Sequence, residues 1–194
     1  MANFETAYKI THGNERGWQN DPDDTGNAAN GLGTFDGIAS KHQPGWKGWA
    51  AIRAALDAAG EQPKHGTPAY RAYQKAINSA LASNEALQVS KLAFYKANFW
   101  DVNRLDEFKS QAVANKIYDS GVNQGTGTAA MILQKILGVM PDGGIGPVTL
   151  AAANKRDGNE LAAAFREARV MKYKNLVAAR PEYLKYLSGW VERC

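Results

Sequence analysis

The chain has 194 residues, of which 44% are hydrophobic and 22% are charged, as in ordinary globular proteins. This composition excludes a largely disordered chain, and no apolar run approaches the about 20 residues that a membrane-spanning helix needs. The formal net charge of +4 suits an anionic polymer as the partner. Cys194 is the only cysteine, which excludes an internal disulfide and a Cys-rich zinc site.

The first half of the chain begins with a helix and then changes character. Asn3 is a typical cap for a helix that ends at Gly13 or Gly17. Residues 19–37 are rich in Asn, Asp and Gly, and they predict an ordered loop or a short hairpin.

The remaining residues show helical spacing of apolar side chains, interrupted by caps and breakers. Further helices are therefore predicted over residues 50–59 before Gly60, from Thr67 and Pro68 to Leu81, from a Ser83 cap to Tyr95, through Val113 and Ile117 to Gly121, from Met131 to Gly138, from Pro147, from Leu161 to a point before Pro181, and around Trp190. The predicted fold class is mainly α, with a small irregular loop or β-hairpin after the first helix.

Residues 11–26 hold the densest cluster of ionisable and turn-forming side chains. Glu15 lies where the first helix meets the polar loop, and Asp24 follows nine positions later. Two carboxylates across a small cleft can share the work of glycoside hydrolysis, one as a general acid and one ionised partner. Trp18 offers an apolar wall and a platform for a sugar ring. The alternative interpretation is that Glu15 is a solvated helix-end charge and that the aspartates are plain turn formers.

Other chemistries have weaker patterns. Residues 21–26 resemble the first half of a calcium loop, but Leu32 stands where a bidentate Glu belongs. The three histidines lack a metal-binding pairing, so we expect neither a metal nor another cofactor. Aromatic residues near basic ones, at 46–49 and 94–100, could stack on nucleic acid, but at helical spacing they favour a core role. We therefore expect no nucleic-acid partner.

Several motifs, taken in order, resemble the glycoside hydrolase family 108 muramidases. The opening of that family is similar to residues 15–26 followed by residues 34–38, and its later landmarks are similar to Tyr95, residues 99–101 and residues 118–125. Residues 133–150 resemble the peptidoglycan-binding half that usually follows, and residues 189–193 match the usual ending.

The resemblance implies a lysozyme-like helical fold and cleavage of the β-1,4 bond after N-acetylmuramic acid in bacterial peptidoglycan. It implies a glycoside hydrolase region over residues 1–100 and a helical peptidoglycan-binding region over residues 101–194, packed as one body. Members are phage endolysins or wall-remodelling enzymes that assist secretion. Residues 1–10 lack the pattern of a secretory signal. We therefore expect a protein that is cytoplasmic on synthesis and reaches the wall by holin-like or specialised export. We also expect the protein to be a monomer.

The resemblance also implies site residues. The glutamate of the family falls on Glu15, and the order of a more distant phage-lysozyme trio places Asp24 and Thr34 beside it. The interval from Asp24 to Thr34 is longer than usual, which leaves Thr25 as an alternative, and Arg16 stands where the family prefers glycine.

Substrate-binding residues are predicted as well. Trp18, Tyr118 and Asn123 are predicted to line the sugar subsites. Two other functions stay open at this point: a lytic transglycosylase, which needs one acid/base glutamate, and a non-catalytic protein that binds the wall or assists secretion.

Overall fold

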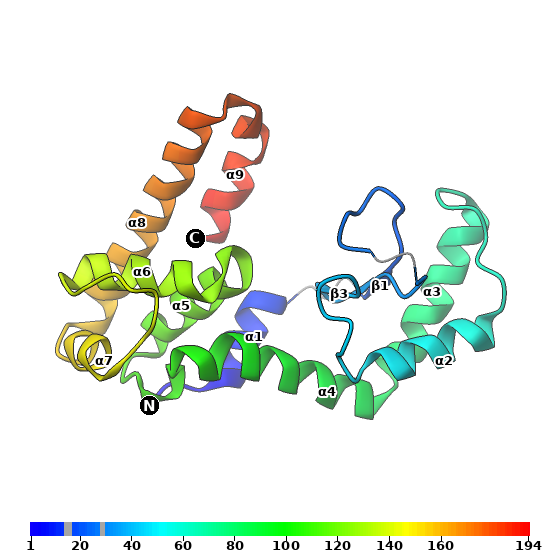
Figure 1. The fold of residues 1–194 in the computed structure, drawn as a ribbon, viewed down its shortest axis with the longest axis horizontal. Helices are drawn as coiled ribbons and strands as arrows, with labels where there is room; N and C mark the ends of the chain where they lie inside the picture. The colour runs from blue at the N-terminus through cyan, green and yellow to red at the C-terminus, as the bar shows by residue number, and fades with distance from the viewer. Residues whose placement is uncertain (14–16, 28–29) are drawn as a thin grey trace. The chain divides into compact units, whose positions relative to one another are not determined.

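The structure is a computed structural model that describes residues 1–13, 17–27 and 30–194. It contains two compact units. Unit 1 combines Met1–Gly13 with Lys96–Cys194, and unit 2 is Asn14–Tyr95. The first helix of the chain therefore belongs to the same unit as the last ones (Figure 1).

Unit 2 carries a small antiparallel sheet in the order β1-β2-β3. The strands are β1 (Trp18–Gln19), β2 (Thr34–Phe35) and β3 (Ile38–Ala39), and Phe35 lies opposite both Trp18 and Ile38. This sheet confirms the predicted loop or hairpin after the first helix.

Three helices complete unit 2, and their ends follow the sequence signals. The helices are α2 (Trp49–Ala59), α3 (Pro68–Ala82) and α4 (Glu85–Tyr95). Gly60 follows α2, and the Thr67 hydroxyl accepts a hydrogen bond from the Tyr70 amide at the start of α3, both as predicted.

The start of α4 differs from the prediction by one residue. Asn84 caps this helix, because its Oδ1 accepts from the Leu87 amide at 2.9 Å. The Ser83 hydroxyl instead donates to the carbonyl of Ser79, one turn back in α3. The prediction of a Ser83 cap was therefore wrong, since the serine is bonded within the previous helix.

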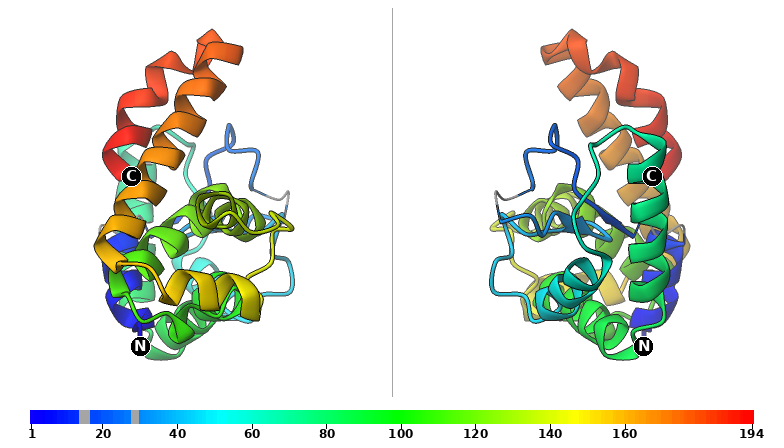
Figure 2. Two further views of the ribbon diagram at one scale, coloured as in Figure 1. Left: turned by 90° about the vertical axis from the view of Figure 1, so that its left-hand side faces the viewer. Right: turned by 90° about the vertical axis from the view of Figure 1, so that its right-hand side faces the viewer.

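The regular elements described in unit 1 are all helical. Asn3 caps α1 (Phe4–His12) by accepting from the Thr6 amide at 3.0 Å, and α1 ends before Gly13 as predicted. The longest helix, α8, lies beside α9 (Figures 1 and 2). The other elements are a π-helical turn (Lys96–Trp100), 3-10 turns (Asp101–Asn103, Leu105–Glu107 and Pro181–Tyr183), α5 (Gln111–Gln124), α6 (Thr126–Leu137), α7 (Pro147–Asn154), α8 (Gly158–Ala179) and α9 (Leu184–Arg193).

The helix α5 continues past Gly121, where the sequence predicted its end. Gly121 lies inside the helix and faces Thr126, and Gly125 ends the helix with φ of 91°, which favours glycine. Gly121 therefore does not end the helix, and a Cβ atom there would have only ordinary contact with Thr126, at 3.5 Å. The other predicted ends, at Gly138 and before Pro181, are confirmed.

Each unit has an aromatic core of its own. In unit 1, Phe4 lies edge-on to Trp100 and Tyr118 at ring distances of 5.8 Å. In unit 2, Trp46 contacts Phe35 and Trp49. Trp49 and Trp100 are buried, as expected for core residues.

The architecture confirms a mainly helical fold with one small sheet. Among the helices of the described ranges, none combines the length and the apolar character that crossing a membrane requires.

Candidate active site

Asp24 is held by a hydrogen-bonded loop that centres on Gln19. The Gln19 amide nitrogen donates to Asp24 Oδ2 at 2.6 Å, and the Gly26 backbone amide donates to Asp24 Oδ1 at 2.8 Å. The Gln19 amide oxygen accepts from the Asp21 backbone amide at 2.6 Å. Both Asp24 carboxylate oxygens therefore have a fixed direction in a half-buried position.

Thr34 joins the same network through Asn27. The Thr34 hydroxyl donates to Asn27 Oδ1 at 2.8 Å, and Asn27 Nδ2 donates to the Asp21 carbonyl at 2.7 Å and to Gln19 Oε1 at 3.3 Å. The structure thus brings Asp24 and Thr34 into one network. Thr25, the alternative, is exposed, and its carbonyl accepts from Lys41 at 3.0 Å.

Gly33 allows the chain to approach this network closely. Its φ is +65°, and a Cβ atom there would lie 2.1 Å from the Gln19 carbonyl oxygen. Any larger residue would therefore push β2, and Thr34 with it, away from β1. The close approach of the Gln19 carbonyl explains why residue 33 is glycine, which the spacing of residues in the sequence did not reveal.

Glu15, the predicted general acid, lies outside the described residues, together with Arg16. The described residues resume at Gly17, and the backbone amides of Gly17 and Trp18 are both hydrogen-bonded to side chains. The Gly17 amide donates to Asp36 Oδ1 at 2.6 Å, and the next amide, that of Trp18, donates to Asn78 Oδ1 at 2.6 Å.

Trp18 is completely buried in unit 2. Its indole N–H donates to the Leu32 carbonyl at 2.8 Å, and its ring lies 6.2 Å from the ring of Tyr73. The ring fixes the loop that returns to β2. This position favours a packing role over the predicted sugar contact, which stays a prediction.

Tyr118 and Asn123, the other predicted subsite residues, lie on α5 in unit 1. Tyr118 is buried, with its hydroxyl 3.3 Å from His12 Nε2. Asn123 is exposed, donates to the Asp119 carbonyl at 2.6 Å and accepts from Arg193 at 2.5 Å. Asn123 thus connects α5 to α9, and its contact with sugar also stays a prediction.

A buried ion pair lies beside Asn123. Arg169 of α8 donates to Asp119 Oδ2 at 2.5 Å, and the arginine side chain is 1% exposed. Burial acts to lower the pKa of Arg169, but the charge of Asp119 and its hydrogen bond outweigh burial and raise this pKa above its ordinary value. The pair joins α5 to α8.

Two aspartates of the acidic loop accept hydrogen bonds within local turns. Asp21 Oδ1 accepts from the Asp23 amide, and Asp24 Oδ1 accepts from the Gly26 amide, so both carboxylates cap local turns. Within residues 1–13, 17–27 and 30–194, no group of three or more His, Cys, Asp and Glu side chains is arranged to hold a metal ion.

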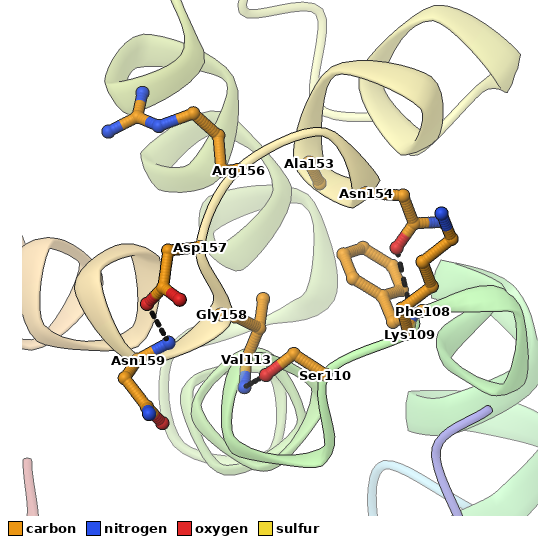
Figure 3. A pocket seen from close by; sticks show the side chains of 10 residues that line it. All are labelled: Phe108, Lys109, Ser110, Val113, Ala153, Asn154, Arg156, Asp157, Gly158 and Asn159. Carbon is orange, nitrogen blue, oxygen red and sulfur yellow. Dashed lines mark hydrogen bonds between the residues drawn. The ribbon is translucent and has the colours of Figure 1, made fainter.

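A polar cavity of about 330 Å³ lies in unit 1, between the starts of α5 and α8. In Figure 3, some of its polar groups bond to the protein's own backbone: Asp157 accepts from the Asn159 amide, and Ser110 accepts from the Val113 amide. Asn154 accepts from the Lys109 amide in the same way. This cavity contains none of the predicted site residues.

Residues 8–125 match the family model glycosyl hydrolase 108. The chain belongs to the glycosyl hydrolase 108 family. This confirms the resemblance found in the sequence, and residues 128–194 match a second model, the predicted peptidoglycan domain. The predicted division between residues 100 and 101 stays a prediction.

The fold of this family member is similar to a solved structure of SagA from Brucella abortus. The two chains are 23% identical, with a TM-score of 0.57, over 98% of this chain and 92% of that chain. At this identity the likeness shows a shared fold. No curated protein sequence matches the chain.

Sequence reasoning missed Gln19 and Asn27 as parts of the site. Both were interpreted as turn residues, yet they hold Asp24 and Thr34 in place. One signal could have identified Gln19: it lies directly before a loop rich in backbone N–H donors and acidic side chains. A side-chain amide at this position can accept a hydrogen bond from one loop group and donate a hydrogen bond to another.

Proposed function

We propose that the chain is an N-acetylmuramidase that hydrolyses the β-1,4 bond between N-acetylmuramic acid and N-acetylglucosamine in bacterial peptidoglycan. The observation that carries the proposal is the family match over residues 8–125. The match of residues 128–194 to a predicted peptidoglycan domain supports peptidoglycan as the substrate.

The proposed chemistry divides the reaction between two carboxyl groups. Glu15 gives its proton to the glycosidic oxygen as the bond to the anomeric carbon breaks. Asp24 accepts a proton from a water molecule that attacks the opposite face of that carbon, and Thr34 helps to orient the water. This division predicts inversion at the anomeric carbon.

The loop geometry supports the proposed role of Asp24. A base that orients water needs a carboxylate with a fixed direction, because small displacements of a reacting group slow the reaction strongly. The Gln19 and Gly26 donors supply that direction, and Asn27 links Thr34 to the same loop.

The test is the release of reducing ends from purified peptidoglycan by the parent enzyme and by Glu15→Gln. The variant keeps the size of the side chain and removes the transferable proton, so its rate should fall by about 10²–10⁴-fold. Glu5→Gln, an exposed change in α1, is the matched control and should leave the rate unchanged. Equal rates for the parent and Glu15→Gln would refute the assignment.

The products separate the proposal from its alternatives. Proton NMR of fresh product should show the inverted α anomer, whereas a retained β anomer would make Asp24 a nucleophile. Anhydro ends in mass spectra, with Asp24 dispensable, would indicate a lytic transglycosylase.

A second candidate function is that of a non-catalytic protein that binds peptidoglycan or assists secretion. The match of residues 128–194 to a predicted peptidoglycan domain favours it independently of Glu15. It predicts sedimentation of the protein with insoluble peptidoglycan and no release of reducing ends.

A further inference from the structure

Asp36 occupies the turn of the β2–β3 hairpin. Asp36 and Gly37 have φ values of 45° and 85°, and they separate the paired residues Phe35 and Ile38. Two residues with positive φ are typical of the tightest hairpin turns, in which Asp-Gly is a favoured pair. The turn alone therefore explains an Asp or Asn at this position.

The side chain of Asp36 has contacts that a hairpin turn does not need. It is buried at 8% exposure, and its Oδ2 accepts from Lys91 Nζ of α4 at 3.0 Å. Lys91 is 2% exposed, and its ammonium group lies 5.7 Å from the ring centroid of Phe35. Asn would serve the turn equally well without this buried charge pair, since burying two charges costs free energy.

The other contacts of Asp36 are with the backbone of Gly17 and with Tyr95. Asp36 Oδ1 accepts from the Gly17 amide at 2.6 Å, and the Asp36 amide donates to the Gly17 carbonyl at 2.9 Å. The carbonyl of Asp36 accepts from the Tyr95 hydroxyl at 2.6 Å. Asp36 therefore connects α4, through Lys91 and Tyr95, to both polar groups of the Gly17 backbone.

Gly17 follows the proposed general acid, Glu15, by two positions in the sequence. We propose that Asp36, paired with Lys91, is a positioning residue for the muramidase reaction: it fixes the backbone of Gly17, two positions after Glu15. The inference rests on the proposed function. It assigns a role in the reaction to a buried pair that lies outside the predicted catalytic trio.

The test compares two double variants that both lack the buried charges. Asp36→Asn/Lys91→Met keeps an acceptor for the Gly17 amide, whereas Asp36→Gly/Lys91→Met removes that acceptor and tolerates the positive φ. We expect kcat within about threefold of the parent for the first variant and a fall of about tenfold or more for the second. The apparent KM for peptidoglycan should change less than threefold, because the substrate contacts are kept.

The single variant Lys91→Met leaves the buried carboxylate of Asp36 without its ammonium partner. Its kcat should also fall by about tenfold, and the second change in Asp36→Asn/Lys91→Met should restore it. The folded fraction of each variant is measured by circular dichroism, and kcat is expressed per folded molecule. If the pair only stabilised the fold, this kcat would already equal that of the parent in Lys91→Met, and the second change would restore nothing. Arg169→Met, which breaks the buried pair of unit 1, is the control and should keep the kcat of the parent.

The outcomes separate the inference from the proposed function. A kcat for Asp36→Gly/Lys91→Met within twofold of the parent overturns the positioning role while the muramidase proposal stands. A parent enzyme that releases no reducing ends overturns the proposed function, and the positioning role falls with it.

Discussion

The buried pairs Asp36–Lys91 in unit 2 and Asp119–Arg169 in unit 1 use similar chemistry to hold different parts of the chain. Asp36 lies in a hairpin turn, and its second carboxylate oxygen accepts from the backbone of Gly17. Asp119 lies within α5 and pairs with Arg169 of α8, so it connects two helices through side chains.

The difference follows from how each unit satisfies its backbone. In α5 and α8 the backbone groups bond within the helix, so a pair of charges acts only on the packing of one helix against another. From Gly17 to Asn27, the described part of this segment has only the short strand β1, so a side chain fixes the backbone of Gly17 directly. Breaking the first pair should therefore affect catalysis, and breaking the second should affect stability.

The largest expected effect on stability comes from Arg169→Met. This change removes the buried guanidinium partner of Asp119 and leaves only the half-exposed Arg193, at 4.0 Å, which should lower the free energy of unfolding by about 3 kcal/mol. Urea denaturation followed by circular dichroism measures the loss. A tenfold fall in kcat for the folded variant would contradict the division of roles between the two pairs.

A smaller effect is expected at the start of α4, the helix that supplies Lys91 and Tyr95. Asn84→Ala removes the acceptor for the Leu87 amide and should cost about 1 kcal/mol, while kcat stays that of the parent. Ser83→Ala is the matched control and should change the unfolding free energy by less than about 0.5 kcal/mol. Equal losses for the two variants would contradict the assignment of Asn84 as the cap.

The smallest expected effect concerns the turn after α6 in unit 1. The Gly144 amide and the buried Gln134 amide donate to Asp142 and lower the pKa of its carboxyl below the ordinary value. A lowered pKa stabilises the fold above the pKa of the unfolded chain, and this contribution is lost as pH falls through the folded pKa.

The parent should therefore be more stable than Asp142→Asn near pH 6, and the gap should close below about pH 4. Urea midpoints measured for both proteins across this pH range give the difference in stability. The effects of the other carboxyl groups cancel, because both proteins contain them. A gap that stays constant with pH would show that the charge of Asp142 has no part in holding the turn.

Local signals in the sequence predicted most helix ends correctly. Asn3, Thr67 and Gly138 each act within one turn of the chain, and the structure uses them as predicted. Ser83 and Gly121 misled the prediction: the Ser83 hydroxyl bonds to the previous helix, and Gly121 lies buried inside α5, which continues to Gln124.

The candidate site was predictable only in part. The order of Glu15, Asp24 and Thr34 along the chain, with the family motifs, pointed to them before any geometry was known. Gln19 and Asn27 were not predicted, because an amide that bridges several loop groups leaves no periodic pattern. Trp18 has the residue type of a sugar platform, yet its burial was invisible in the sequence.

The sequence by itself determined the helical class, the irregular segment after the first helix and the family, because spacing, caps and motif order are properties of neighbouring residues. Only the tertiary structure decided what Asp36 and Lys91 do. They lie 55 positions apart, and the pairing of a buried charge depends on which segments fold against each other. The same holds for Asp119 and Arg169, whose contact exists only once α5 and α8 pack together.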